Sequence, residues 1–275
     1  MHHQEAQGIG RLETGLGHEA WQRRLPEAAL QALAREVITR MAPASRPCGA
    51  NGAGPADDRV DTFCDALLSP DANAARQMIA KLRRAGADYD ELYLDLLTPA
   101  AHRLGTRWEE DAASFIEVSM GIGRIYGILY DLRDLHPLVA AADKPHALFA
   151  TLPDEEHTLG ATIAADLFRE RGWDVDLLIG LDHTSLVDAI DQSSAPVIGI
   201  SAARGEDLAA LMRLVVAVHV HRPALRVFVA GNIMCDQPDI GEFTGIDGAA
   251  REFEAAYSGI CELLDSVRTP SVYAG

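Results

Sequence analysis

Short apolar runs that alternate with helical segments from residue 144 onward constrain the fold of this chain more than any other feature. The runs occupy 147–152, 175–179, 197–201 and 227–230, and the helical segments occupy 160–171, 184–192, 206–220 and 248–266. Apolar strands that alternate with helices are typical of a parallel sheet covered on both faces. We therefore expect a doubly wound parallel sheet over residues 144–268, with a short fifth strand near 243–246.

A helical region precedes the alternating part. Its helices are expected at 58–68, 71–85, 90–104 and 112–135, with Gly105 as the stop of the third. Short connections predict an antiparallel bundle over residues 57–140. Residues 1–56 read as a polar tail, a helix at 26–41 and a linker rich in proline, glycine and alanine. The predicted fold class is therefore α/β, a helical bundle followed by a five-stranded parallel sheet.

The charge and cysteine content exclude several classes of protein. The net charge is −17, and an acidic surface repels phosphate, so a broad basic face for DNA or RNA is not expected. The four cysteines are scattered without a C-x-x-C pair, which argues against a disulfide framework or a zinc site. No segment has about 18 consecutive apolar residues. We expect a soluble, cytoplasmic protein.

A histidine lies where the first apolar run ends. His157 sits in the loop between that run and the next helical segment, with Glu155 two residues before it and Gly160 three residues after it. Ligands of open α/β sheets bind at such strand ends. A carboxylate that bonds one ring nitrogen of a histidine leaves the other free for a metal, and a glycine admits a bulky ligand. The loop predicts a ligand site with His157 as metal ligand.

Three short elements at strand ends carry a resemblance to a known family. They are Glu155-x-His157-x-x-Gly160, then Ser201-Ala202-Ala203, then Gly231-Asn232. The set resembles the cobalamin-binding module of methionine synthase, corrinoid proteins and cobalamin photoreceptors. The fingerprint there is Asp-x-His-x-x-Gly, Ser-x-Leu and Gly-Gly, so each element here differs at one position. The resemblance covers roughly residues 57–266 and implies a flavodoxin-like cobalamin-binding domain at 144–268.

The resemblance also implies roles for these residues. His157 would coordinate cobalt from below and displace the ligand's own base, Glu155 would orient its ring, and Ser201 would reach the displaced base. Gly160 and Gly231 would leave room for it. The implied cofactor-binding set at the strand ends is Glu155, His157, Thr158, Leu159, Gly160, Ser201, Gly231 and Asn232. Because Asn232 replaces the second glycine, heme stays open as an alternative ligand.

The helical region carries a second, partial match to this family. Trp108, Phe115 and Glu117 follow one another at spacings close to the family's Trp…Glu-His cap, with Val118 in place of the histidine. The resemblance implies that this segment covers the upper face of the ligand. Loss of the cap histidine and the presence of Phe115 favour a sensor or storage role over methyl or adenosyl transfer. We expect a protein that is not an enzyme.

A closer resemblance lies in LGTRWEEDAASFIEVSMGIGRIYGIL and ALAREVITRM. Both segments are similar to the AerR/PpaA group of photosynthesis-gene regulators, tetrapyrrole-binding antirepressors of purple bacteria. This implies a cobalamin-binding, light-responsive regulator that acts on a repressor of the CrtJ/PpsR type. The resemblance implies that light changes the upper cobalt ligand. A tail histidine such as His18 would then coordinate the cobalt. The alternatives are a heme-binding redox sensor and a corrinoid carrier in methyl transfer.

Overall fold

The computed structural model describes residues 55–134 and 144–268, which belong to one compact unit. Five parallel strands form its sheet in the order β2-β1-β3-β4-β5. Their bounds are β1 His146–Thr151, β2 Asp174–Leu178, β3 Val197–Ser201, β4 Arg226–Ala230 and β5 Gly248–Ala250. The predicted α/β fold class is therefore confirmed. The helix expected at 26–41 and the tail histidine His18 lie outside the described residues.

The fifth strand is not where the sequence suggested. Residues 243–246 form a loop, and Phe243 and Ile246 are apolar because they pack against the hydrophobic core. The strand follows at Gly248–Ala250 and pairs with β4. It consists of small residues only, so its sequence carries no strand pattern.

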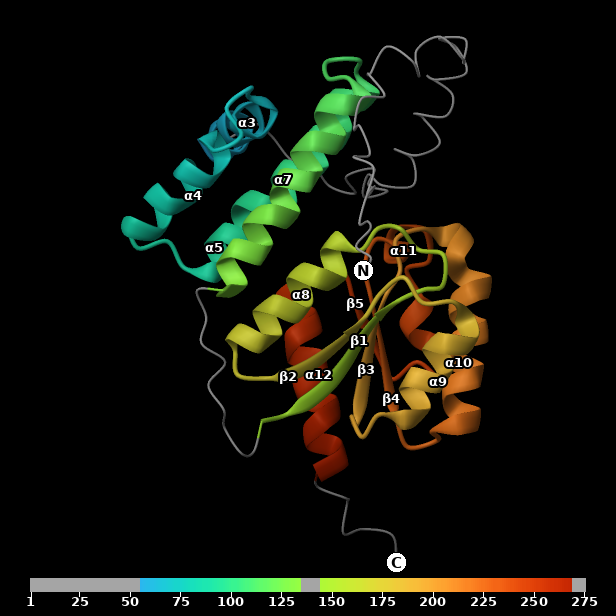
Figure 1. The fold of residues 1–275 in the computed structure, drawn as a ribbon. Helices are drawn as coiled ribbons and strands as arrows, with labels where there is room; N and C mark the ends of the chain where they lie inside the picture. The colour runs from blue at the N-terminus through green and yellow to red at the C-terminus, as the bar shows by residue number, and fades with distance from the viewer. Residues whose placement is uncertain (1–54, 135–143, 269–275) are drawn as a thin grey trace, which may run out of the picture. The chain divides into compact units, whose positions relative to one another are not determined.

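Helices cover both faces of the sheet (Figure 1). Helices α8 (Leu159–Glu170) and α12 (Phe253–Arg268) lie on one face, and α9 (His183–Gln192) and α10 (Leu208–His221) lie on the other. Two hydrophobic cores result, because successive strand residues point to opposite faces. Leu148 and Ala150 enter the core under α9 and α10, whereas Phe149 packs edge-on against Phe168 of α8.

The helical region ahead of the sheet packs around a core of its own. Its elements are α3 Pro55–Leu68, α4 Ala74–Arg84, α5 Tyr89–Leu92, a π-helical turn Tyr93–Leu97, α6 Thr98–Glu109 and α7 Phe115–Asp134. The expected stop at Gly105 is wrong, because Gly105 is buried within α6 and the helix continues to Glu109. The chain turns instead at Asp111, whose φ is 56°. Acidic residues 109–111 therefore lie at the C-terminus of α6.

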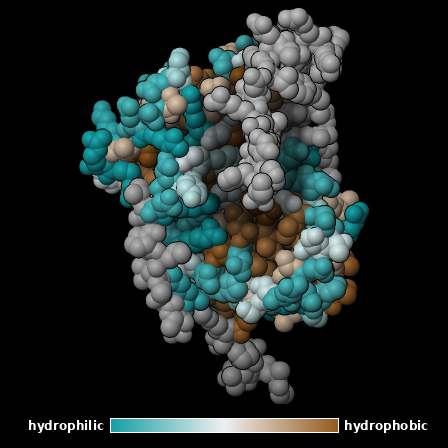
Figure 2. Space-filling view, in the orientation of Figure 1, coloured by the Kyte–Doolittle hydropathy of each residue, from teal (hydrophilic) through white to brown (hydrophobic). Residues whose placement is uncertain are grey.

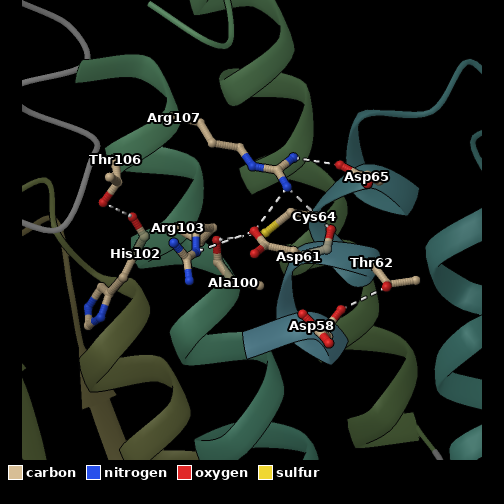
Figure 3. A network of polar contacts seen from close by, with 10 residues as sticks. All are labelled: Asp58, Asp61, Thr62, Cys64, Asp65, Ala100, His102, Arg103, Thr106 and Arg107. Atoms are coloured by element: carbon tan, nitrogen blue, oxygen red, sulfur yellow. Dashed lines mark hydrogen bonds and ion pairs between the residues drawn. The ribbon is translucent and has the colours of Figure 1, made fainter. Parts of the chain in front are cut away.

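A group of ion pairs joins α3 to α6 (Figure 3). The Arg107 guanidinium donates to Asp61 at 3.0 Å and to Asp65 at 2.7 Å, and Arg103 lies 3.4 Å from Asp61. Beneath them, the Cys64 thiol donates to the Ala100 carbonyl at 3.6 Å. Burial raises the pKa of Cys64 to about 12, so this thiol stays protonated and packs as a small apolar side chain.

The helical region is attached to the sheet domain through α8. Ile163 and Leu167 of α8 belong to the core of the helical region. Arg133 of α7 donates to both carboxylate oxygens of Asp166, each at 2.7 Å, and the Asp166 side chain is only 4% exposed. Arg171, just after α8, donates to Asp90 at 2.7 Å. Apolar and charged contacts together join α8 to the helical region. No helix among the described residues is long and apolar enough to cross a membrane.

Candidate functional site: a histidine loop at the switch point of the sheet

The sheet order places the candidate site at a switch point. From β1 the chain turns to β2 on one side, whereas β3 pairs with β1 on the other side. The loops after β1 and β3 therefore leave in opposite directions, and the gap between them is the usual ligand crevice of such sheets. Thr151, the last residue of β1, is paired in register with Ser201, the last residue of β3.

The predicted pair of His157 and Glu155 is present at this point. The Glu155 carboxylate accepts a hydrogen bond from the His157 backbone N–H at 2.7 Å and is also hydrogen-bonded to ring atom Nδ1 through the same oxygen. Both side chains are nearly inaccessible to solvent, at 6% for His157 and 2% for Glu155. A short loop thus holds a buried imidazole at a fixed orientation against a carboxylate.

The ionisation state of Glu155 determines which ring nitrogen is free. Burial alone would raise the pKa of the Glu155 carboxyl, but hydrogen bonds from the His157 side chain and backbone outweigh it and hold that pKa below its usual value. Glu155 is therefore a carboxylate near neutral pH and accepts from a protonated Nδ1. In the neutral form of the imidazole this tautomer has its lone pair on Nε2, the arrangement found for metal-ligating histidines.

Three buried polar atoms at the end of β1 have no hydrogen-bond partner among the described residues. They are His157 Nε2, Glu155 Oε2 and Thr151 Oγ1. Buried polar atoms are nearly always paired, because an unpaired one costs free energy. A bound group that bonds His157 Nε2 would complete the hydrogen bonding of the loop. An imidazole nitrogen is a good ligand for a cobalt ion, so the residues present fit a corrinoid bound here.

The loops after β3 and β4 are held tightly together at the same edge. Gly231 has φ +115°, and a Cβ at this position would stand 2.4 Å from the Ala202 carbonyl oxygen. The Ala202 N–H donates to Ala230, and Ala202 accepts from Ile233. Asn232 follows as the N-cap of the short helix α11 (Ile233–Asp236). Only glycine fits at 231, so this residue brings the two loops into contact.

Gly160 is different, because it faces open space. It is exposed in the first turn of α8, and a Cβ there would meet no atom within 4 Å. The two residues before it contact the helical region. The Thr158 hydroxyl is hydrogen-bonded to Tyr126 of α7 at 2.8 Å, and Leu159 packs against the core of that region. The histidine loop therefore touches both the sheet and α7.

The three residues predicted to cap the ligand lie around the turn between α6 and α7. Trp108 is partly buried against the core of the helical region, and Phe115, the first residue of α7, is also partly buried. Glu117 is exposed and accepts from the Ser114 N–H at 2.8 Å and from its hydroxyl at 2.6 Å. This pairing caps the N-terminus of α7. This hydrogen bonding gives Glu117 a structural role at the start of α7. The role of the segment as a cover over the ligand stays a prediction.

Apolar surface is gathered over the sheet between α8 and α9 (Figure 2). Large, mostly apolar ligands bury most of their surface against such areas, with a few polar groups to fix them.

Two residues of the candidate site were not predicted from the sequence. Thr151 ends β1 after the buried apolar residues 147–150, and a polar residue at the end of that buried run was a usable signal. Tyr126 had no such signal, because its contact with Thr158 spans 32 residues of sequence.

Comparisons with known proteins agree with this geometry. Residues 145–260 match a family model described as the B12 binding domain, and residues 60–121 match a second model with the same description. The solved monomethylamine corrinoid protein of Methanosarcina barkeri superposes with a TM-score of 0.61 at 12% identity. The match covers 75% of this chain and 98% of that protein. A cobalamin-binding protein from Desulfitobacterium hafniense DCB-2 is 16% identical, over 74% of this chain and 98% of that protein, with a TM-score of 0.40.

One curated relative comes from Rhodobacter capsulatus. It is described as an uncharacterized 20.5 kDa protein in the bchF-crtJ intergenic region of Rhodobacter capsulatus. It is 29% identical over 172 residues, which are 61% of this chain and 88% of the relative. Together, the two matched segments show that the chain carries B12 binding domains, and the relative is consistent with a B12-binding protein of the AerR/PpaA type.

Proposed function

We propose that this protein is a cobalamin-binding, light-responsive transcriptional regulator. It acts as an antirepressor of photosynthesis genes through a repressor protein of the CrtJ/PpsR type. The observation that carries cobalamin binding is the buried Nε2 of His157, which has no partner among the described residues. The regulatory role is supported by the AerR/PpaA resemblance and by the relative named for the bchF-crtJ intergenic region.

The residues of the chain divide the task of holding the cofactor. His157 would supply the lower ligand, and Glu155 would hold its ring in a fixed orientation through Nδ1. Ser201 and Thr151 stand at the ends of adjacent strands, where the displaced base would lie. Cobalamin supplies a cobalt centre whose upper ligand responds to light. We also propose that Trp108, Phe115 and Glu117 lie over that upper side. His18 would become a second metal ligand after illumination.

The test is cobalamin binding by the full chain with His157→Ala. Without the imidazole, affinity should fall by more than the roughly 10–100-fold loss that is typical of removing an outer hydrogen-bond partner of a ligand. The absorption bands of bound cobalamin should also shift. His221→Ala, an exposed histidine at the end of α10, serves as the matched control and should bind like the unmodified protein. Unchanged affinity together with an unchanged cobalt spectrum would contradict the assignment of His157.

Two alternatives separate cleanly from this proposal. A corrinoid carrier would share the fold, and the likeness to the monomethylamine corrinoid protein supports the fold alone. A carrier should accept a methyl group from a partner methyltransferase, whereas a regulator should change its spectrum on illumination. A heme-binding redox sensor would show a Soret band in place of corrinoid bands. Both matched family models name B12, so cobalamin is the ligand that we favour.

A further inference from the structure

The central strand β3 is accessible to solvent near its carboxyl end. Strand β3 is paired on both sides and the sheet is covered on both faces, so its residues are expected to be buried. Val197, Ile198 and Ile200 are fully buried. Gly199 and Ser201, by contrast, are partly exposed. Because Ile198 and Ile200 fill the core under α9 and α10, solvent reaches Gly199 from the face that α8 and α12 cover.

This opening has a limited depth, and we call it the β3 slot. Ser201 lies at its mouth, and Gly199 lies two residues further down the same face of the strand. Val197, two residues deeper again, is fully buried and closes the slot. Two residues of a strand span roughly 7 Å. The slot therefore has about the depth of a flat bicyclic aromatic ring.

The bottom of the β3 slot is apolar. Gly199 is paired in register with Phe149 of β1, and a Cβ at Gly199 would stand 3.2 Å from two ring atoms of Phe149. The same Cβ would stand 3.7 Å from Cδ1 of Ile260, which belongs to α12. The side chains of Phe149 and Ile260 have no hydrogen-bonding atoms. A polar group that enters as far as Gly199 therefore meets no side-chain partner from these two residues.

The mouth of the β3 slot is polar. Thr151 is paired in register with Ser201 and shares the face of Phe149, because residues two apart in a strand point the same way. Thr151 is 2% exposed, and its Oγ1 has no partner among the described residues. The chain continues from Thr151 into the loop of His157. A ligand that binds at this loop can thus place an acceptor at the hydroxyl groups of the mouth.

We propose that the β3 slot makes this chain selective among corrinoids, for dimethylbenzimidazole as the attached base over adenine. The inference rests on the proposed binding of cobalamin through His157, which displaces the base from cobalt. The nitrogen that leaves cobalt is an acceptor and suits the hydroxyl groups at the mouth. The other end of dimethylbenzimidazole carries two methyl groups, which suit contact with Phe149 and Ile260. Adenine carries an amine and ring nitrogens there, which would lose their hydrogen bonds to water.

The first test compares three ligands on the full chain by equilibrium titration followed by absorbance. They are cobalamin, its analogue with adenine as the base, and cobinamide, which has no base. We expect cobalamin to bind at least about fivefold more tightly than the adenine analogue, because a buried polar group without a partner weakens binding by that factor or more. Equal affinities for these two would overturn the selectivity and leave cobalamin binding intact. Failure of all three to bind would overturn the selectivity together with the proposed function.

The second test fills the β3 slot with Gly199→Ala. The added methyl group lies against Phe149 and Ile260, and alanine is no worse than glycine in the interior of a strand, so the fold should persist. Cobalamin affinity should fall at least about tenfold, whereas cobinamide affinity should stay within about twofold, because cobinamide has no base to place in the slot.

The matched control for this variant is Gly123→Ala on α7, where a Cβ would meet no atom within 4 Å. It should bind cobalamin and cobinamide like the unmodified chain. A Gly199→Ala chain that loses affinity for both ligands equally, or for neither, would show that the base does not enter the β3 slot and would overturn the proposal.

Discussion

At the scale of single residues, the sequence indicated the buried histidine–carboxylate pair but not its full surroundings. The spacing of Glu155 and His157 after an apolar run was enough to predict a carboxylate-supported imidazole, and the structure brings the two together. The unpaired Oγ1 of Thr151 and the bond between Tyr126 and Thr158 were not predicted. Both depend on which strands and helices become neighbours, and a local pattern does not encode that.

Replacing Glu155 by alanine tests its supporting role. The His157 ring would lose its acceptor at Nδ1 and could rotate or change tautomer, so the lone pair on Nε2 would no longer be fixed. We expect cobalamin affinity to fall about 10–100-fold, which is less than for His157→Ala. Equilibrium titration followed by absorbance measures this. Glu155→Gln is the informative companion, because its amide oxygen can still accept from Nδ1. A loss as large for Gln as for Ala would point to the charge of Glu155 rather than its hydrogen bond.

Gly231→Ala tests the contact between the β3 and β4 loops. A side chain is strained at φ +115°, and its Cβ would stand 2.4 Å from the Ala202 carbonyl oxygen. Backbone strain alone should lower the free energy of unfolding by about 1–3 kcal/mol. Urea denaturation measures the change. Gly172→Ala, also at positive φ but with no atom within 4 Å of a Cβ, separates strain from the clash. Equal losses in the free energy of unfolding at both positions would show that the clash with Ala202 adds nothing to the backbone strain.

At the scale of elements, the sequence predicted the sheet better than the turns. Strand β3 was predicted residue for residue, because its apolar run is bounded clearly by Pro196 and by a change in composition after Ser201. Strand β5 was missed because Gly248–Ala250 has no β-branched or aromatic residue. The end of α6 was misplaced because Gly105 reads as a stop in sequence, yet packing buries it within the helix. Tertiary packing overrides local propensity at both places.

The contact between α7 and α8 gives a prediction with a pH dependence. Burial raises the pKa of the Asp166 carboxyl, although Arg133 and Arg169 oppose the shift. Arg133→Met removes one cation, so the buried carboxylate loses a partner and its pKa should rise further. At pH 7.5 we expect a loss of about 1–3 kcal/mol in the free energy of unfolding.

The sign of the pH effect follows from linkage. An acid whose pKa is raised in the folded state takes up a proton more readily there, so stability is gained as pH falls. The penalty of Arg133→Met should therefore shrink between pH 7.5 and pH 4.5, where protonation removes the need for a cation. Paired urea titrations of both proteins at the two pH values measure this difference. A penalty that is the same at both pH values would mean that Asp166 does not change its ionisation in this range.

At the scale of the whole molecule, surface charge limits how this chain could carry out the proposed regulation. The chain has 24 basic and 41 acidic side chains, which gives the net charge of −17. DNA carries a dense line of phosphates, and proteins that bind it rely on clustered lysine and arginine for most of their non-specific affinity. Several arginines of the described region are already committed to carboxylates, including Arg107, Arg133 and Arg171. The molecule as a whole should therefore be repelled by DNA.

The purified chain, with cobalamin bound, should accordingly not bind promoter DNA by itself. At physiological salt we expect no shift of a labelled promoter fragment at protein concentrations up to about 10 µM, a range in which many DNA-binding proteins already bind without sequence preference. When a repressor of the CrtJ/PpsR type is added, the chain should change the amount of DNA that this repressor holds, because the proposed regulation passes through a protein contact. The His157→Ala protein is the control, since it should fold but lack the proposed lower cobalt ligand. Sequence-specific binding by the chain alone would contradict regulation through a partner and would require a local basic surface that the overall charge conceals.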